Sequence, residues 1–153
     1  AEPLQAGFTV DDHAQGAGQF DANRITQLIR KRDKTRPIDQ TSGWFDQGGG
    51  DFKSVHNYFR KLDVVKDHRA FALSEYGGYA CRIEGHSSVE RIYGYKKFST
   101  KEEFSKAYRR LLDTELKPLI EKGLCAAVYT QLSDVEEEVN GLLTYDRKVC
   151  KPQ

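Results

Sequence analysis

The sequence predicts an α/β domain in which short parallel strands alternate with helices. Three observations lead to this fold class. Two segments carry the apolar periodicity of amphipathic helices, short apolar runs follow them, and turn residues separate the segments. Strands that alternate with helices favour a parallel sheet with crossover connections. The chain has 153 residues, which is the length of one ordinary domain.

The first helix is predicted to begin after Asp21 and to end before Pro37. Asp21 can accept the hydrogen bond of an N-cap, and Phe20 with Ile25 fits a hydrophobic staple. A proline disfavours helical geometry in the residue before it, so the helix ends ahead of Pro37. Residues 1–18, which are rich in glycine and charge, are predicted to form an irregular leader.

Four strands are expected, at residues 38–44, 55–59, 71–73 and 124–129. The run 71–73 is compact and apolar and is followed at once by Glu75 and two glycines, as in a buried strand that ends in a functional turn. The run 124–129 is continuously apolar. We therefore predict that it is buried on both faces.

The second helix is predicted between Thr100 and Gly123. Thr100 with Glu103 fits a capping box, and Gly123 is well placed as the C-terminal cap. Pro118 is expected to bend the last turn. One face of the helix carries an apolar stripe made of Phe104, Ala107, Tyr108, Leu111, Leu112 and Leu116.

The charge balance argues against nucleic-acid and membrane partners. Lys and Arg number 24 against 23 acids, so the formal net charge is +1 and no strong overall field attracts phosphates or anionic lipid. No stretch approaches the roughly 20 apolar residues of a membrane span, and the N-terminus lacks the pattern of a signal peptide. We expect a soluble chain whose compartment the sequence leaves unknown. The absence of methionine indicates a processed product or an excised fragment.

Metal and cofactor sites are not expected. The three cysteines lie far apart, without zinc-site spacing or the density of a disulfide scaffold. His13, His68 and His86 lack ligand spacing. The glycine run at residues 48–50 lacks the Lys and the following helix of a phosphate-binding loop, and is predicted to be a flexible turn.

Polar and aromatic residues gather where the predicted strands end. In parallel α/β barrels the reacting groups project from the carboxyl ends of the strands. A carboxylate beside aromatic rings suits sugar chemistry, since it can attack an oxocarbenium-like centre while the rings stack on the pyranose. The alternative is that Glu75 forms a salt bridge and the aromatic residues belong to the core. The candidates are Glu75 for catalysis and Trp44, His56, Asn57, Tyr58 and Tyr76 for substrate binding.

Several motifs in a fixed order carry a family resemblance from about Gly18 to Val149. They are Thr35, Arg36 and Pro37; Ser42, Gly43 and Trp44; Gly50 and Asp51; His56, Asn57 and Tyr58; Ser74, Glu75, Tyr76, Gly77 and Gly78; Tyr129, Thr130 and Gln131; Asp134, Val135 and Glu136; and Asn140, Gly141 and Leu142. In this order they resemble glycoside hydrolase family 2, the family of β-galactosidases, β-glucuronidases and β-mannosidases.

The resemblance implies that Glu75 is the nucleophile of a retaining mechanism. It also implies a partial (β/α)₈ TIM barrel, about strands five to eight with their helices, in which residues 19–153 form the C-terminal half of the catalytic domain. A complete barrel needs about 250 residues. Asp134, Glu137 and Asn140 match a family motif after the last strand, where we expect them to fix a loop.

The sequence departs from the family at the acid/base position. Counting back from the first helix, the matching positions hold Ala14 and Gln15, and glutamine cannot donate the proton that a leaving oxygen needs. Asp11, Asp12 and His13 are the other candidates for the donor. We therefore expect the isolated chain not to hydrolyse glycosides at a normal rate. The alternative function is a non-catalytic carbohydrate-binding or structural remnant of the same fold.

The expected partners are a carbohydrate and further strands. Four strands cut from a closed barrel leave edges and an apolar face exposed, which favours self-association or pairing with the absent half-barrel.

Overall fold

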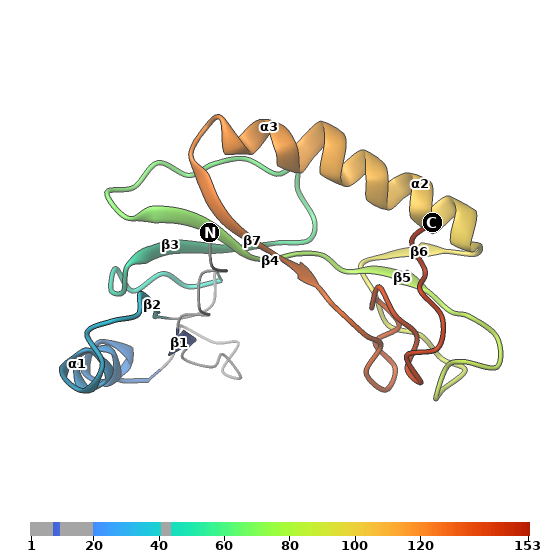
Figure 1. Cartoon of the computed structure of the whole chain (residues 1–153), viewed down its shortest axis with the longest axis horizontal. Coiled ribbons are helices and arrows are strands. Elements are labelled where there is room, and N and C mark those ends of the chain that lie inside the picture. The colour runs from blue at the N-terminus through green and yellow to red at the C-terminus, as the bar shows by residue number, and fades with distance from the viewer. Residues whose placement is uncertain (1–7, 10–19, 41–43) are drawn as a thin grey trace.

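The computed structural model of the chain describes residues 8–9, 20–40 and 44–153, and its architecture is mixed α/β (Figure 1). The central sheet has the order β3-β4-β7, and all its strands are parallel. It is built from β3 (Phe52–Asn57), β4 (Ala70–Gly77) and β7 (Leu124–Thr130). The predicted fold class, α/β with parallel strands, is confirmed.

Two smaller parallel pairs flank this sheet. The first joins β1 (Phe8–Thr9) to β2 (Ile38–Asp39), and the second joins β5 (Tyr79–Cys81) to β6 (Lys96–Phe98). The sequence did not predict β5 and β6, because three-residue strands carry too little alternation to stand out. The strand expected at residues 38–44 is described only at Ile38–Asp39, and residues 41–43 lie outside the described part.

The first helix, α1 (Ala22–Arg32), begins after Asp21 and ends before Pro37, as predicted. The staple is wrong, however, because Phe20 is 92 % exposed. Asp21 has a φ of 59°, so its backbone is left-handed and not extended as at an ordinary N-cap, and its side chain makes no cap hydrogen bond. Its carboxylate pairs with Arg24. This backbone turn directs Phe20 away from the helix.

The second helical segment comprises α2 (Lys101–Arg110), the π-helical turn η1 (Leu111–Leu116) and α3 (Lys117–Ile120). The Thr100 hydroxyl accepts from the Glu103 N–H at 3.2 Å, and the Glu103 carboxylate accepts from the Ser99 N–H at 3.1 Å, so the predicted N-terminal cap is confirmed. The wide π turn lies just before Pro118, whose ring would clash with a carbonyl of a regular α-helix. Gly123 ends the segment with a φ of 107°, as a C-terminal glycine is expected to.

The hydrophobic core lies between this helical segment and one face of the sheet. Figure 1 shows α2 and α3 extended along that side of the strands. Strand residues Phe71, Leu73 and Tyr76 are buried there in one cluster with Phe104 and Leu111 from the helices. Their burial leaves the other face of β4 free to carry polar groups.

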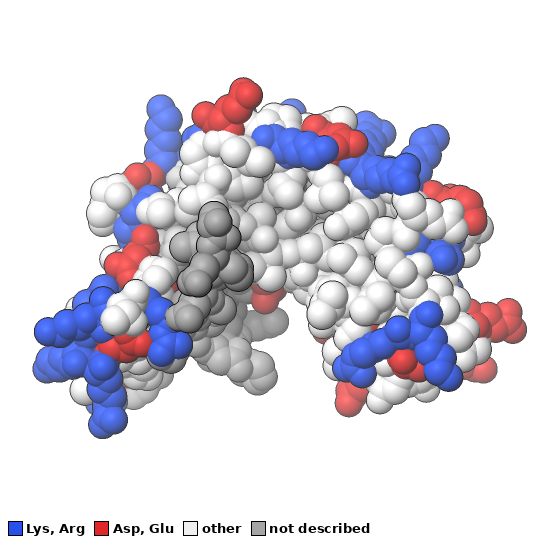
Figure 2. Space-filling view, viewed as in Figure 1, with Lys and Arg blue, Asp and Glu red and all other residues white. Residues whose placement is uncertain are grey.

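The predicted burial of β7 on both faces is wrong. Residues 125–128 are exposed, and Val128 is 57 % exposed. The strand is the edge of the central sheet, and because successive residues alternate between its faces, the small apolar side chains of residues 125–128 meet solvent on both faces. Figure 2 shows that the side of the molecule away from the long helix is hollowed, and that Lys and Arg gather over α1.

Candidate functional site

Glu75 lies near the carboxyl end of β4, on the face of the sheet opposite the core. A register irregularity in β4, where Ser74 is passed over in the pairing, places His56 of β3 directly across from Glu75. The carboxylate Oε2 of Glu75 is 3.3 Å from the Nδ1 atom of His56 and 2.5 Å from the hydroxyl of Tyr58. The Glu75 side chain is 41 % exposed, whereas that of His56 is 4 % exposed. The site is thus an accessible carboxylate that is hydrogen-bonded to a buried phenol and lies close to a buried imidazole.

Tyr58 is a fixed hydrogen-bond donor to Glu75. Its hydroxyl lies 2.5 Å from the carboxylate and 2.9 Å from the Oγ1 atom of Thr130, at the end of β7. A phenol has one proton, so the phenol donates to the carboxylate and the hydroxyl of Thr130 donates to the phenol oxygen. Burial and the negative charge of Glu75 raise the pKa of Tyr58 far above its ordinary value, and the phenol remains protonated at every physiological pH.

Aromatic rings pack against His56 and Tyr58, the two neighbours of this carboxylate. The Trp44 ring meets His56 edge-on at 5.6 Å between centroids and lies 6.2 Å from the Tyr58 ring. The Tyr58 ring stacks on Tyr95 at 3.9 Å. A cavity of about 490 Å³ is lined by Trp44, His56 and Tyr58 among others. Exposed carboxylate and flat aromatic surfaces therefore stand together, as sugar recognition requires.

The structure does not bring every predicted site residue to Glu75. Asn57 stabilises a turn: its Oδ1 accepts from the Arg60 N–H at 3.0 Å and its amide donates to the Lys61 carbonyl at 3.2 Å. Tyr76 is buried in the core on the other face of β4, edge-on to Tyr129. Gln15 lies outside the described residues.

The alternative interpretation of Glu75, a salt bridge, is met in this part of the chain only by His56, which is charged only when protonated. Within residues 20–40 and 44–153, no Lys or Arg forms a salt bridge with its carboxylate, and its ionic contact is with His56. A carboxylate without a permanent cation remains available to a ligand.

A second polar group on the same face was missed by the sequence analysis. The hydroxyl of Ser54 donates to the Asp39 carboxylate at 2.9 Å and lies 2.5 Å from the hydroxyl of Ser74, the residue before Glu75. These side chains link β2, β3 and β4. Burial raises the pKa of Asp39 to about 6, although the Ser54 hydrogen bond and the Arg69 charge act in the opposite direction. No sequence motif marks this group, because one Asp and two Ser at distant positions form no spacing pattern.

The raised pKa of Asp39 predicts a pH-dependent stability. Between pH 3.8, its ordinary value, and about 6, the folded state binds more protons at Asp39 than the unfolded state does. The free energy of unfolding therefore falls as the pH rises through this window. Replacing Asp39→Asn should remove this fall. Between pH 4 and pH 8, the free energy of unfolding of the variant should therefore rise by about 1–2 kcal/mol relative to that of the parent, after allowance for partial exposure.

Urea denaturation at pH 4 and pH 8 measures this effect, and Asp33→Asn is the matched control. Hydrogen bonds from Thr35 lower the pKa of Asp33 to about 2, so its stabilisation is present above the ordinary value and is lost as the pH falls. Asp46 also faces Asp39, but Arg69 holds its pKa well below the usual range and it stays charged throughout. Equal pH slopes for Asp39→Asn and the parent would contradict the prediction.

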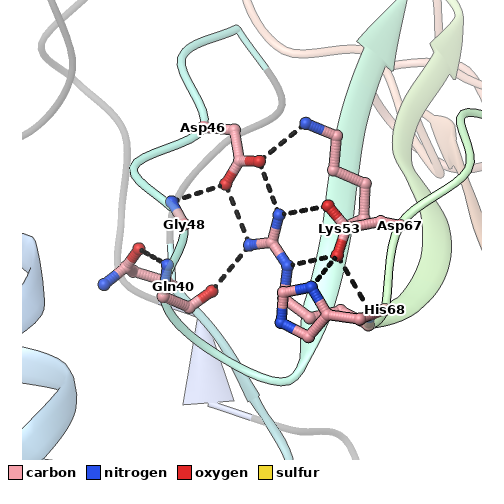
Figure 3. Close-up of polar contacts among 8 residues, drawn as sticks. Gln40, Asp46, Gly48, Lys53, Asp67 and His68 are labelled. Carbon is pink, nitrogen blue, oxygen red and sulfur yellow. Dashed lines mark hydrogen bonds and ion pairs between the residues drawn. The ribbon is translucent and has the colours of Figure 1, made fainter.

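The guanidinium of Arg69 holds the loop that leads from Trp44 to β3. Figure 3 shows the polar contacts around Asp46, Lys53 and Asp67 in this loop and its neighbours. Arg69 donates to both carboxylate oxygens of Asp46, to both of Asp67 and to the Gly49 carbonyl. Lys53 adds a second ion pair to Asp46 at 2.6 Å. The glycine run, predicted to be a flexible turn, is thus hydrogen-bonded through Gly48 and Gly49, and these bonds anchor the loop that begins at Trp44.

No family model and no curated protein matches the sequence of this chain. The described residues contain no group of three or more His, Cys, Asp or Glu side chains placed to hold a metal ion. None of the helices described is long and apolar enough to cross a bilayer.

Proposed function

We propose that this chain is the C-terminal half of a (β/α)₈ barrel of a retaining glycoside hydrolase that cleaves terminal β-linked sugars, with Glu75 as its nucleophile. The observation that carries the proposal is the position of the Glu75 carboxylate. It lies at the carboxyl end of a parallel strand, accessible, and bonded to Tyr58 at 2.5 Å. The ordered motifs that resemble glycoside hydrolase family 2 support the same assignment.

The surroundings of Glu75 suit a nucleophile that must be held in one orientation. The Tyr58 hydroxyl donates a hydrogen bond to the carboxylate at 2.5 Å. This bond orients Oε2 and leaves the second oxygen, Oε1, to approach an anomeric carbon. Trp44 provides an apolar ring for a pyranose face at the edge of the same group.

A second candidate function is non-catalytic carbohydrate binding. It is favoured by Gln15, which the resemblance places at the acid/base position. Retaining hydrolysis requires a second carboxyl group about 5–5.5 Å from the nucleophile. Without it, the first step proceeds only when the leaving group needs no proton.

A covalent trapping experiment tests the nucleophile separately from the missing acid. The probes are 2,4-dinitrophenyl 2-deoxy-2-fluoro-β-glycosides of galactose, glucose, mannose and glucuronic acid. The Glu75 carboxylate attacks the anomeric carbon, and dinitrophenolate leaves with the bonding electron pair without protonation. We expect one fluorosugar per chain, found by mass spectrometry on the peptide that contains Glu75.

Two variants control the labelling. Glu75→Gln should abolish it, while Glu84→Gln, an exposed glutamate on another loop, should leave it unchanged. No label from any of the four sugars, or a label that persists in Glu75→Gln, would overturn the assignment.

The same preparation is measured by light scattering, because the exposed edge of β7 is proposed to pair with a second copy or with the absent half-barrel. A clean monomer at high concentration would remove that part of the proposal.

A further inference from the structure

A second cavity, of about 420 Å³, adjoins the one at Trp44 and shares residues 57–61 of its lining. It opens between the β3–β4 connection, the residues at the end of β4, and the helical segment α2–η1. Figure 1 shows that the β3–β4 connection passes close to α3, and the Leu62 N–H donates to the Glu115 carboxylate at 3.1 Å across this gap. Tyr58 and Leu62 contribute buried surface to the cavity.

The charged side chains that line the cavity are mostly basic. Four basic side chains line the cavity against one carboxylate, that of Glu115; they are Arg60, Lys61, Lys96 and Arg110. All four are exposed at the rim, whereas the floor is made of buried residues such as Tyr79 and Leu111. The chain as a whole has a net charge of only +1, so this is a local concentration of positive charge.

Within the described part of the chain, none of these four basic residues takes part in a salt bridge. Some other Lys and Arg residues there form ion pairs, as Lys53, Arg69 and Lys122 do, and others, such as Lys31 and Lys106, form none. Like charges around one opening repel each other, and this cost is relieved when an anion binds.

Two features place donors at the rim. Lys96 lies over the Tyr79 ring at 5.1 Å, and its ammonium is 3.4 Å from the Tyr79 hydroxyl, so the aromatic floor holds the cation at the opening. Arg110 is the last residue of α2, next to the wide turn of η1, whose residues Leu111, Thr114 and Glu115 all line the cavity. Single π-type turns inside helices often occur at functional sites.

We propose that this cavity binds a small ligand through a tetrahedral oxyanion, a phosphate or sulfate ester group, with Lys96 and Arg110 as its principal partners. Arginine offers two parallel N–H donors to such a group, and lysine supplies a compact charge. The buried tyrosine floor takes the flat, less polar part of the ligand. The volume suits a ligand of the size of a sugar phosphate, not a polymer.

Isothermal titration of the full chain tests the proposal, at constant ionic strength held with potassium chloride. The probes are glucose 6-phosphate, glucose 6-sulfate, inorganic phosphate, inorganic sulfate and, as the neutral control, glucose. We expect saturable binding of the esters and none of glucose. The relative affinities of the two esters distinguish phosphate from sulfate as the preferred group.

Matched variants locate the binding. The double variant Lys96→Gln and Arg110→Gln should weaken ester binding by roughly tenfold for each cation removed. The control, Lys31→Gln and Lys106→Gln, changes the net charge equally but lies on α1 and on another turn of α2. Circular dichroism checks that both fold.

Equal weakening by the two double variants would show non-specific attraction, and no saturable binding of any ester or ion would show that the cavity is not an anion site. Either result overturns the proposal. The readout is binding and not turnover, so the outcome is independent of whether Glu75 is labelled by a fluorosugar.

Discussion

Replacing Lys151→Met is expected to lower the free energy of unfolding by about 3–5 kcal/mol, because it leaves a buried carboxylate without its counter-ion. The Lys151 ammonium donates to the Asp134 carboxylate at 2.5 Å and to the Val139 carbonyl at 2.9 Å. Both side chains of the pair are 0 % exposed. Burial raises the pKa of Asp134 and lowers that of Lys151, which reflects how strongly the interior disfavours either charge by itself.

The pair also connects distant parts of the chain, and this adds to the expected loss. The Asp134 carboxylate accepts from the Gly141 N–H at 2.9 Å, and the Lys151 carbonyl accepts from the hydroxyl of Ser105 in α2 at 3.2 Å. Through these bonds the C-terminal tail, the loop after β7 and α2 are joined. Without the ammonium, the tail loses its side-chain link to the loop and keeps only backbone bonds such as that from the Lys151 N–H to the Leu142 carbonyl.

Urea denaturation monitored by circular dichroism measures the effect, and a double variant is the control. Lys151→Met combined with Asp134→Asn removes both charges, so it should be clearly more stable than Lys151→Met, although still less stable than the parent. A Lys151→Met variant within 1 kcal/mol of the parent, or a double variant less stable than the single one, would contradict this account.

The location of the candidate site was predictable because strand ends leave a local signal. The apolar run before Glu75 identified the buried strand, and the polar and glycine residues after it marked its end. The structure places Glu75, His56, Tyr58 and Trp44 together at this end. Which of these side chains touch depends on the register between β3 and β4, and a single sequence carries no information on that register.

Other features could not be predicted, because they depend on which segments of the chain become neighbours in the fold. The apolar run of β7 is compatible with a central strand or an edge strand, and only the sheet order leaves Val128 exposed. Tyr76 follows Glu75 directly and so points to the opposite face of the strand, into the core. The link from Asp39 through Ser54 joins residues 15 positions apart, which no local pattern records.

For the loop after β7, the structure gives the physical basis of a role that the sequence predicted. Asp134 and Asn140 were expected to fix a loop and not to act on a substrate. Both are buried, and the Asn140 side chain accepts from the Gln131 amide at 2.7 Å. Gln131 follows Thr130, whose hydroxyl is hydrogen-bonded to Tyr58. The bonds of Gln131 therefore help to keep Thr130 in contact with Tyr58.

Replacing Gln15→Glu is expected to raise the turnover of β-glycosides with poor leaving groups by about 10²–10⁴-fold, as a positioned general acid does. The expectation rests on the proposed function, in which position 15 corresponds to the acid/base residue. A glutamate can protonate the departing oxygen and then deprotonate the attacking water, whereas a glutamine can do neither. Methyl and 4-nitrophenyl β-galactosides and β-glucuronides are the substrates, and the parent chain should turn them over slowly if at all.

The leaving group and the pH profile separate this effect from a general change in the chain. Gln15→Glu should gain most with the methyl glycoside and least with the dinitrophenyl one, whose departure needs no proton, and its rate should fall at high pH as the new acid ionises. Gln5→Glu adds the same charge to the same leader and should give no gain. Adding Glu75→Gln to the Gln15→Glu chain should abolish the gain, since the acid assists only a nucleophile that is present. A gain that is equal for both glutamine variants, or that is independent of the leaving group, would remove position 15 from the mechanism.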